Sequence, residues 1–124
     1  MSEECARLAI VGYRSFSDYN YFASCVDDYI AGNRSLKIIE IVSGGAKGVD
    51  QLAERYADEH QIPLRIFSAE WSTYGKSAGP RRNAQIVEHA SHVLAFLHEK
   101  SRGTRNTIRL AQQAGKPVKI VALM

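Results

Sequence analysis

Short apolar runs rich in β-branched residues alternate with longer amphipathic stretches along the whole chain. The runs at 7–12 (RLAIVG), 37–42 (KIIEIV), 62–67 (IPLRIF), 92–97 (HVLAFL) and 116–124 (KPVKIVALM) are predicted strands. Between them, apolar residues recur at helical spacing, which predicts helices at 19–31, 49–60, 80–89 and from about 103 to 113. This alternation predicts an α/β fold: an open, doubly wound, mostly parallel sheet of at least five strands with helices on both faces.

The length and composition indicate one folded domain spanning residues 1–124. Apolar residues make up 45% and charged residues 23%, as in globular proteins. No apolar run approaches the roughly 18 residues that a membrane span needs, and the N-terminus has acids where a signal peptide has bases. We therefore expect a soluble, cytoplasmic protein with no membrane partner. The cysteines and histidines lack zinc-ligand spacing, so no metal site is predicted.

Charge is divided unevenly along the chain. Residues 1–75 carry 7 Lys/Arg and 11 Asp/Glu, a net charge of −4, whereas residues 76–124 carry 9 and 2, a net charge of +7. The basic second part favours phosphate-bearing ligands, nucleic acid or small nucleotides, over cationic ones. The alternative is a solvated basic face with no ligand.

Ligands of open parallel sheets bind beyond the carboxyl ends of the strands, where this chain places its unusual residues. The segment after the first predicted strand offers Gly12, Tyr13 and Arg14. The segment after the second, SGGAKGVD, contains Ser43, Gly44, Gly45, Ala46 and Asp50. Because glycines let backbone N–H groups approach a ligand and the next helix start is positive, we interpret SGGAKGVD as a phosphate-binding loop. The alternatives are a tight turn that only needs glycine, and an Asp50 that caps its helix instead of binding a ribose hydroxyl.

Arginines gather at two predicted helix starts. In AGPRRN, Pro80 is the expected first helical residue, which places Arg81 and Arg82 in the first turn, followed by Asn83. Around the next start lie Ser101, Arg102, Gly103, Thr104 and Arg105. Since a helix N-terminus disfavours cations, the same violation at two starts suggests a shared anion, most simply a phosphate. The alternative is that these arginines bend away into solvent.

Few other side chains at this edge can do chemistry. Trp71 is the favoured residue for stacking on a base, although aromatic rings more often serve packing. The acids near this edge are Asp50, Glu70 and Glu99, and the candidates for acid–base catalysis are Glu70 and Asp50. No motif of a covalent nucleophile accompanies them.

Three segments, SGGAKGVDQLAERYA, AEWSTYGKSAGPRRNAQIV and SRGTRNTIRLAQQAGKPV, together resemble the SLOG superfamily and, within it, the small stand-alone YspA/YpsA-related branch. The resemblance spans 10–121 and implies a Rossmann-like sheet whose glycine-rich and GT loops bind a nucleotide or a nucleotide-derived ligand. It also implies a homodimer or a higher homo-oligomer. More distant relatives are the lysine decarboxylase-like phosphoribohydrolases, DprA/Smf-type binders of single-stranded DNA, and sensors of NAD-derived or cyclic ADP-ribose signals.

The resemblance has two further implications for individual residues. The family motif has an arginine directly before the asparagine, which is Arg82 here, so Arg81 is the extra cation. The phosphoribohydrolases carry PGGxGTxxE, and aligning its GT with Gly103 and Thr104 puts Thr107 where the catalytic glutamate would be. Because threonine cannot act as a general base at neutral pH, this hydrolase activity is not expected unless Glu70 substitutes.

The leading hypothesis is therefore a sensor or sequestering protein for an ADP-ribose-like, NAD-derived or other phosphorylated nucleoside ligand, with no further cofactor. The first alternative is an enzyme that cleaves the N-glycosidic bond of a nucleotide. The second is DprA-like binding of single-stranded DNA. The basic second part supports this alternative, but its cations cluster at helix starts and do not form a stripe with spaced aromatics.

Overall fold

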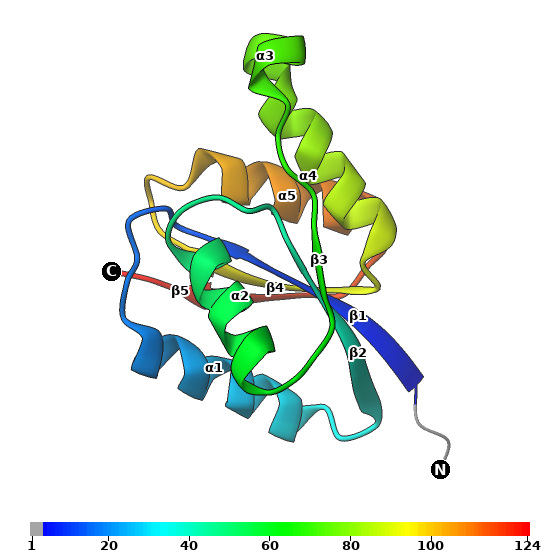
Figure 1. Cartoon of the computed structure of the whole chain (residues 1–124). Helices are drawn as coiled ribbons and strands as arrows, with labels where there is room; N and C mark the ends of the chain where they lie inside the picture. Colours follow the sequence, from blue (N-terminus) through cyan, green and yellow to red (C-terminus); the bar gives the residue numbers. More distant parts are fainter. Residues whose placement is uncertain (1–3) are drawn as a thin grey trace.

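The computed structural model describes residues 4–124, and five parallel strands form one sheet in the order β3-β2-β1-β4-β5. The elements are β1 (Glu4–Gly12), α1 (Tyr19–Gly32), β2 (Leu36–Ser43), α2 (Val49–Glu59), β3 (Leu64–Ile66), α3 (Trp71–Tyr74), the 3₁₀ helix η1 (Gly75–Ser77), α4 (Ala78–His89), β4 (His92–Leu97), α5 (Arg102–Gln113) and β5 (Val118–Ala122). The predicted α/β, Rossmann-like fold is confirmed (Figure 1).

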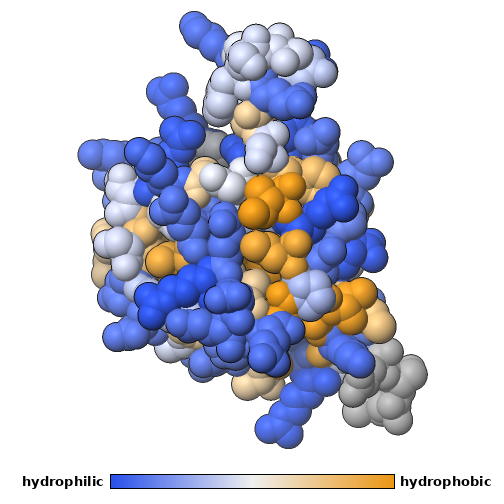
Figure 2. All heavy atoms as spheres, in the orientation of Figure 1, coloured by the Kyte–Doolittle hydropathy of each residue, from blue (hydrophilic) through white to orange (hydrophobic). Residues whose placement is uncertain are grey.

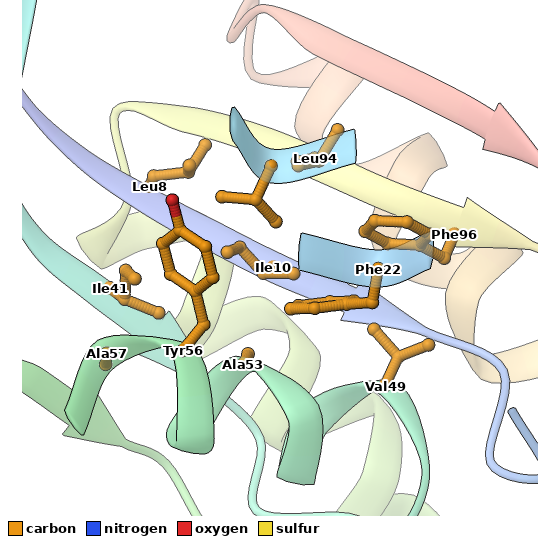
Figure 3. Close-up of a cluster of buried hydrophobic side chains, with 11 residues drawn as sticks. Leu8, Ile10, Phe22, Ile41, Val49, Ala53, Tyr56, Ala57, Leu94 and Phe96 are labelled. Carbon is orange, nitrogen blue, oxygen red and sulfur yellow. The ribbon is translucent and has the colours of Figure 1, made fainter. Parts of the chain in front are cut away.

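Helices cover both faces of the sheet, and each face has its own apolar core. On one face, Phe22 of α1 and Tyr56 of α2 pack against Leu8 and Ile10 of β1 (Figure 3). On the other face, α4 and α5 pack through a set that includes Ile86, Val87, Ile108 and Ala111. The helical spacing of these apolar residues explains the layers, because each helix can bury only one stripe of its surface.

The edge strand β3 is shorter than predicted and consists of the three residues Leu64–Ile66. Leu64 and Ile66 remain exposed, as does Ile39 of the neighbouring strand β2. Figure 2 shows an apolar strip on the side of the molecule where β3 lies in Figure 1. A short edge strand limits the length of backbone that another chain could pair with.

The helix predicted to begin at Pro80 begins two residues earlier, at Ala78. It follows α3 and η1, which occupy a segment predicted to be a loop. Pro80 is tolerated as the third helical residue because the first four N–H groups of a helix have no intrahelical partner. Arg81 and Arg82 are therefore the fourth and fifth helical residues instead of the second and third. The segments α3, η1 and the start of α4 project from the sheet as an arm (Figure 1).

No helix within residues 4–124 combines the length and the apolar character that crossing a membrane requires.

Candidate functional site

A pocket of about 690 Å³ lies at the carboxyl edge of the sheet, beside the ends of β1 and β4. These two strands are neighbours, but the chain leaves β1 towards α1 on one face and leaves β4 towards α5 on the other. The two loops diverge at this point, which opens the crevice where such sheets bind ligands. Most of the residues predicted for the site line this pocket: Gly12, Tyr13, Arg14, Ala46, Asp50, Trp71, Arg82, Asn83, Ser101, Arg102, Gly103 and Thr104.

Two backbone N–H groups of the glycine-rich loop between β2 and α2 donate to side chains of the same segment. The N–H of Gly45 donates to Ser43 Oγ over 3.2 Å, and the N–H of Ala46 donates to Asp50 Oδ2 over 3.1 Å. Ser43 is fully buried and lies with Gly44 and Gly45 outside the pocket lining. The loop therefore positions Asp50 and Arg82, and phosphate binding by its backbone stays a prediction.

Gly44 separates the two charged side chains of this part of the site. A Cβ atom at Gly44 would lie 2.7 Å from Arg82 Nη1 and 2.9 Å from Asp50 Oδ2. Glycine is needed here because any side chain would displace one of the two charged groups.

Asp50 is a buried carboxyl group in the wall of the pocket. It is 5% exposed, and burial raises its pKa to about 6, against the opposing effects of the Ala46 N–H and the Arg82 charge. Within residues 4–124 it is the one acidic residue that lines the pocket. A carboxyl that titrates near neutrality can change its hydrogen-bonding role with small changes of pH.

Arg82 and Asn83 connect the two loops that face each other across the pocket. Arg82 Nη1 donates to the carbonyl of Gly44 over 2.6 Å, and its Nε donates to Asn83 Oδ1 over 2.9 Å. Asn83 Nδ2 in turn donates to the carbonyl of Gly103 over 3.3 Å and to Asn106 Oδ1 over 3.0 Å. Burial lowers the pKa of the Arg82 guanidinium, which keeps its charge at any physiological pH. A ligand that displaces one of these loops can therefore displace the other through this chain of hydrogen bonds.

Asn106 lines the pocket and was missed by the sequence predictions. The signal that could have found it is its spacing, since it follows Gly103 by three residues on the same helix and such residues share a face.

The start of α5 is open towards the pocket. Ser101 precedes the helix, but its Oγ accepts from the N–H of His98 over 3.1 Å and does not cap α5. A Cβ atom at Gly103 would meet no atom of residues 4–124 within 4 Å, so the backbone is accessible there. Thr104 is 6% exposed, and within residues 4–124 its hydroxyl has no hydrogen-bond partner. The Gly103 backbone and the Thr104 hydroxyl are therefore open to a ligand.

The two aromatic residues that line the pocket, Tyr13 and Trp71, differ in accessibility. The ring of Tyr13 is already stacked on His98, with centroids 4.1 Å apart and an interplanar angle of 7°. Trp71 is 52% exposed, and the edge of its indole lies over Gly79, where an added Cβ would be 3.2 Å from the ring. The open indole face makes Trp71 the better platform for a base.

Three predicted residues with charged side chains lie outside the pocket lining. Arg81 packs its guanidinium 4.2 Å from the centre of the Tyr74 ring and donates to Ser77 Oγ over 3.3 Å. Arg105 donates to the backbone carbonyls of His98 and Glu99. Glu70 is exposed at the start of α3. Of the four arginines at the two helix starts, the structure brings Arg82 and Arg102 to the pocket.

No group of three or more His, Cys, Asp or Glu side chains in the described part of the chain is arranged to hold a metal ion.

Comparison with known proteins finds relatives of most of the sequence. A sequence model of the YspA, cpYpsA-related SLOG family matches residues 6–74, which is more than half of the chain. The Gene 61 protein of Mycobacterium phage D29 is 35% identical over 118 residues, which cover 90% of this chain and 93% of the phage protein.

Three solved structures share the fold at low sequence identity. DNA processing protein A from Helicobacter pylori, studied for its mode of binding single-stranded DNA, has a TM-score of 0.69 and 20% identity over 95% of this chain and 66% of its own. The Streptococcus pneumoniae protein of the same name has a TM-score of 0.69 and 23% identity over 92% of this chain and 49% of its own. TM1055 has a TM-score of 0.63 and 18% identity over 90% of this chain and 72% of its own. The chain thus spans just under two thirds of the first structure and about half of the second.

Proposed function

The chain belongs to the YspA, cpYpsA-related SLOG family, and from this premise we propose that its pocket binds a phosphorylated nucleotide. The candidates are an ADP-ribose-like or NAD-derived ligand, or another phosphorylated nucleoside. The pocket volume of about 690 Å³ lies within the roughly 300–1,000 Å³ that is typical of small-molecule sites. In this proposal the protein senses or sequesters its ligand.

The open start of α5 is the observation that carries this proposal. A phosphate placed there could accept from the free backbone donors near Gly103 and from the unpartnered hydroxyl of Thr104. Arg102 from the same turn and Arg14 from the facing loop line the same pocket and would neutralise its charge. A cation in the first turn of a helix is unfavourable on its own and becomes favourable with an anion beside it.

We propose binding without cleavage of the N-glycosidic bond, because the pocket lacks the glutamate of the hydrolases at the matching position. Thr107 occupies the position of the hydrolase glutamate, is 1% exposed, and donates its hydroxyl to the carbonyl of Gly103 over 3.2 Å. It therefore holds the loop together and offers no base to the ligand. If turnover occurs, Asp50 is the candidate, since Glu70 lies outside the pocket lining.

Mass spectrometry of the ligand released from protein purified under mild conditions tests the proposal directly. We expect a phosphorylated nucleoside in the extract, and the identified compound then serves for calorimetric titration. Arg82→Ala is expected to abolish binding and Arg81→Ala to weaken it only slightly, because Arg81 points to Tyr74.

Arg82 also holds the Gly44 carbonyl, so Arg102→Ala is the second pocket variant, one that leaves the β2–α2 loop intact. Equal effects of the Arg81 and Arg82 variants would place the site elsewhere. Release of free base from nucleoside monophosphates or NAD derivatives would show the protein to be an enzyme.

Binding of single-stranded DNA is the second candidate function. It is favoured by the shared fold with the Helicobacter pylori protein and by the net charge of +7 in residues 76–124. Oligonucleotide affinity should then fall with salt, with a log–log slope of about −0.7 for each phosphate contacted. A flat salt response, or binding of mononucleotides alone, would exclude this function.

A further inference from the structure

The charges in the pocket are strongly asymmetric. Four cationic residues line it, namely Arg14, Arg82, Lys100 and Arg102, together with a single carboxylate from the described residues, Asp50. The four cations would neutralise an anionic ligand, but an anionic ligand does not explain why a carboxylate is buried among them. Burying a charge without a close partner is unfavourable, so a carboxylate kept in such a position requires a separate reason.

Asp50 has hydrogen-bonding capacity left after its contacts within the protein. Its Oδ2 accepts from the N–H of Ala46 over 3.1 Å, and the N–H of Gly44 is a second backbone donor to the carboxylate. Within residues 4–124, no nitrogen of a Lys, Arg or His side chain lies within 4.0 Å of its oxygens. A carboxylate has about four acceptor positions, so about two remain for a ligand in the pocket.

We propose that Asp50 binds the ribose hydroxyls of the ligand and makes the pocket selective for ribonucleotides over deoxyribonucleotides. The inference rests on the proposed nucleotide binding and specifies which residue recognises the sugar. A vicinal diol presents two O–H donors side by side, which matches the two free acceptor positions of one carboxylate. Arg82, on the other side of Gly44, supplies the cation for the phosphate attached to the same sugar.

A role restricted to capping the loop would not explain the placement. The two backbone donors could be satisfied by a neutral asparagine, which also accepts hydrogen bonds but carries no charge into the pocket. The carboxylate differs from an amide in that it accepts at both oxygens, and this property matters for a ligand with two donors. Asp50→Asn therefore separates loop capping from sugar recognition.

Calorimetric titration with AMP, 2′-deoxy-AMP, ADP-ribose and ribose 5-phosphate tests the inference. We expect the wild-type protein to bind AMP about 10- to 100-fold more tightly than 2′-deoxy-AMP at pH 7.5, as a hydrogen bond to a charged group predicts. Ribose 5-phosphate, which lacks the base, should retain the diol contribution and reveal it apart from any contact between Asp50 and an exocyclic amine.

Asp50→Asn should reduce this preference to about 3-fold or less. Removing the negative charge should strengthen phosphate binding for both nucleotides alike, so the ratio of the two affinities is the diagnostic quantity. Asp58→Asn is the matched control, since Asp58 is an exposed carboxylate on the same helix and lies outside the pocket lining. It should preserve the wild-type preference.

The wild-type protein also provides a test that needs no variant. Burial places the pKa of Asp50 at about 6, so the AMP preference should shrink between pH 7.5 and pH 5 as the carboxylate is protonated. The charged groups around Asp50 are Arg82 from α4, Glu54 from α2, and Arg14 from the loop after β1. The ligand phosphate titrates near pH 6 in both nucleotides, so its effect cancels in the ratio.

Equal wild-type affinities for AMP and 2′-deoxy-AMP would overturn the inference and leave nucleotide binding standing. An unchanged preference in Asp50→Asn would assign the discrimination to another residue and overturn it as well. If none of the four probes binds, the proposed function itself fails, and the inference fails with it.

Discussion

Charged and polar groups are paired differently at the two ends of the sheet. At the end opposite the pocket, Lys116 donates to the carbonyls of Val87, Glu88 and Ala90 at the carboxyl end of α4. At the pocket end, Asp50 is buried beside cations that do not pair with it, and α2, α4 and α5 begin without a side-chain cap. A positive charge at a helix carboxyl end stabilises the fold, whereas Arg102 at a helix start does not.

At the end opposite the pocket, hydrogen bonds also join residues that are far apart in the sequence. Arg7 Nε donates to the carbonyl of His89 over 2.6 Å, and the N–H of Arg7 donates to Ser91 Oγ over 2.9 Å. Glu40 of β2 pairs with His89 of α4 over 2.5 Å. The end opposite the pocket thus carries contacts that stabilise the fold, whereas the pocket end keeps unsatisfied groups, which the proposed ligand would use.

The largest effect is expected from Gly48→Ala in the loop before α2. Gly48 has φ +75°, and an added Cβ would lie 2.3 Å from the carbonyl oxygen of Arg14 and 2.4 Å from that of Tyr13. We expect a loss of about 4 kcal/mol or more in the free energy of unfolding, since backbone strain and a backbone clash act together. Urea unfolding of the purified variant measures it.

Gly115→Ala, at the opposite end, is the matched control. Gly115 has φ +72°, but an added Cβ would meet nothing within 4 Å. The loss should be about 1 kcal/mol, from the positive φ alone. Similar losses for the two glycines would show that the close approach of the loops after β1 and β2 is unimportant.

Asp50→Asn should stabilise the protein at neutral pH. Because the pKa of Asp50 rises from 3.8 to about 6 on folding, its contribution to stability is fully present below pH 3.8 and is lost as the pH rises through 6. The variant should match the wild type near pH 4 and exceed it by up to about 3 kcal/mol at pH 7 to 8. Thermal unfolding of the wild type and the variant across this range, with Asp58→Asn as the exposed control, measures the difference in stability.

A wild type that is more stable than Asp50→Asn at pH 8 would mean that Asp50 contributes net stability, and the contrast between the two ends would lose its main support.

Lys116→Met should destabilise the protein by about 2 kcal/mol without changing ligand affinity. Methionine keeps an aliphatic side chain of similar length, so the loss reports the hydrogen bonds to the end of α4 and the favourable charge there. Urea unfolding and calorimetric titration of the same preparation separate the two properties. A clear loss of affinity would show that the ends are coupled through α4.

Glu40→Gln should have the smallest effect, a loss of about 0.5 to 1 kcal/mol. The side chains of His89 and Glu40 are 31% and 24% exposed, so solvent weakens their attraction, and glutamine can still hydrogen-bond. Affinity for a nucleotide should be unchanged, because neither residue lines the pocket. A loss above 2 kcal/mol would instead place the pair among the main supports of this end.

The sequence predicted the elements well where apolar periodicity was strong. The strand predicted at 92–97 matches β4 (His92–Leu97), and the helix predicted at 19–31 ends one residue before α1 does. The prediction failed at 71–79, where α3, η1 and the first residues of α4 replace an expected loop. This arm is short, and within it only Ala78 and Gly79 are buried, so it carries almost no apolar stripe from which a helix could be recognised.

The predictions for the candidate site residues also succeeded in part. The order of strands and loops along the chain was sufficient to predict the α/β fold and the edge of the sheet where Gly12, Asp50, Trp71 and Gly103 gather. The resemblance distinguished Arg82 from Arg81, but the packed structure was needed to show that Arg82 and Arg102 line the pocket while Arg81 and Arg105 turn away. Neighbouring residues on a helix point about 100° apart, so which of two arginines faces a ligand depends on how the helix is rotated against the sheet. Burial, which gives Asp50 its raised pKa, is likewise a property of the packed molecule.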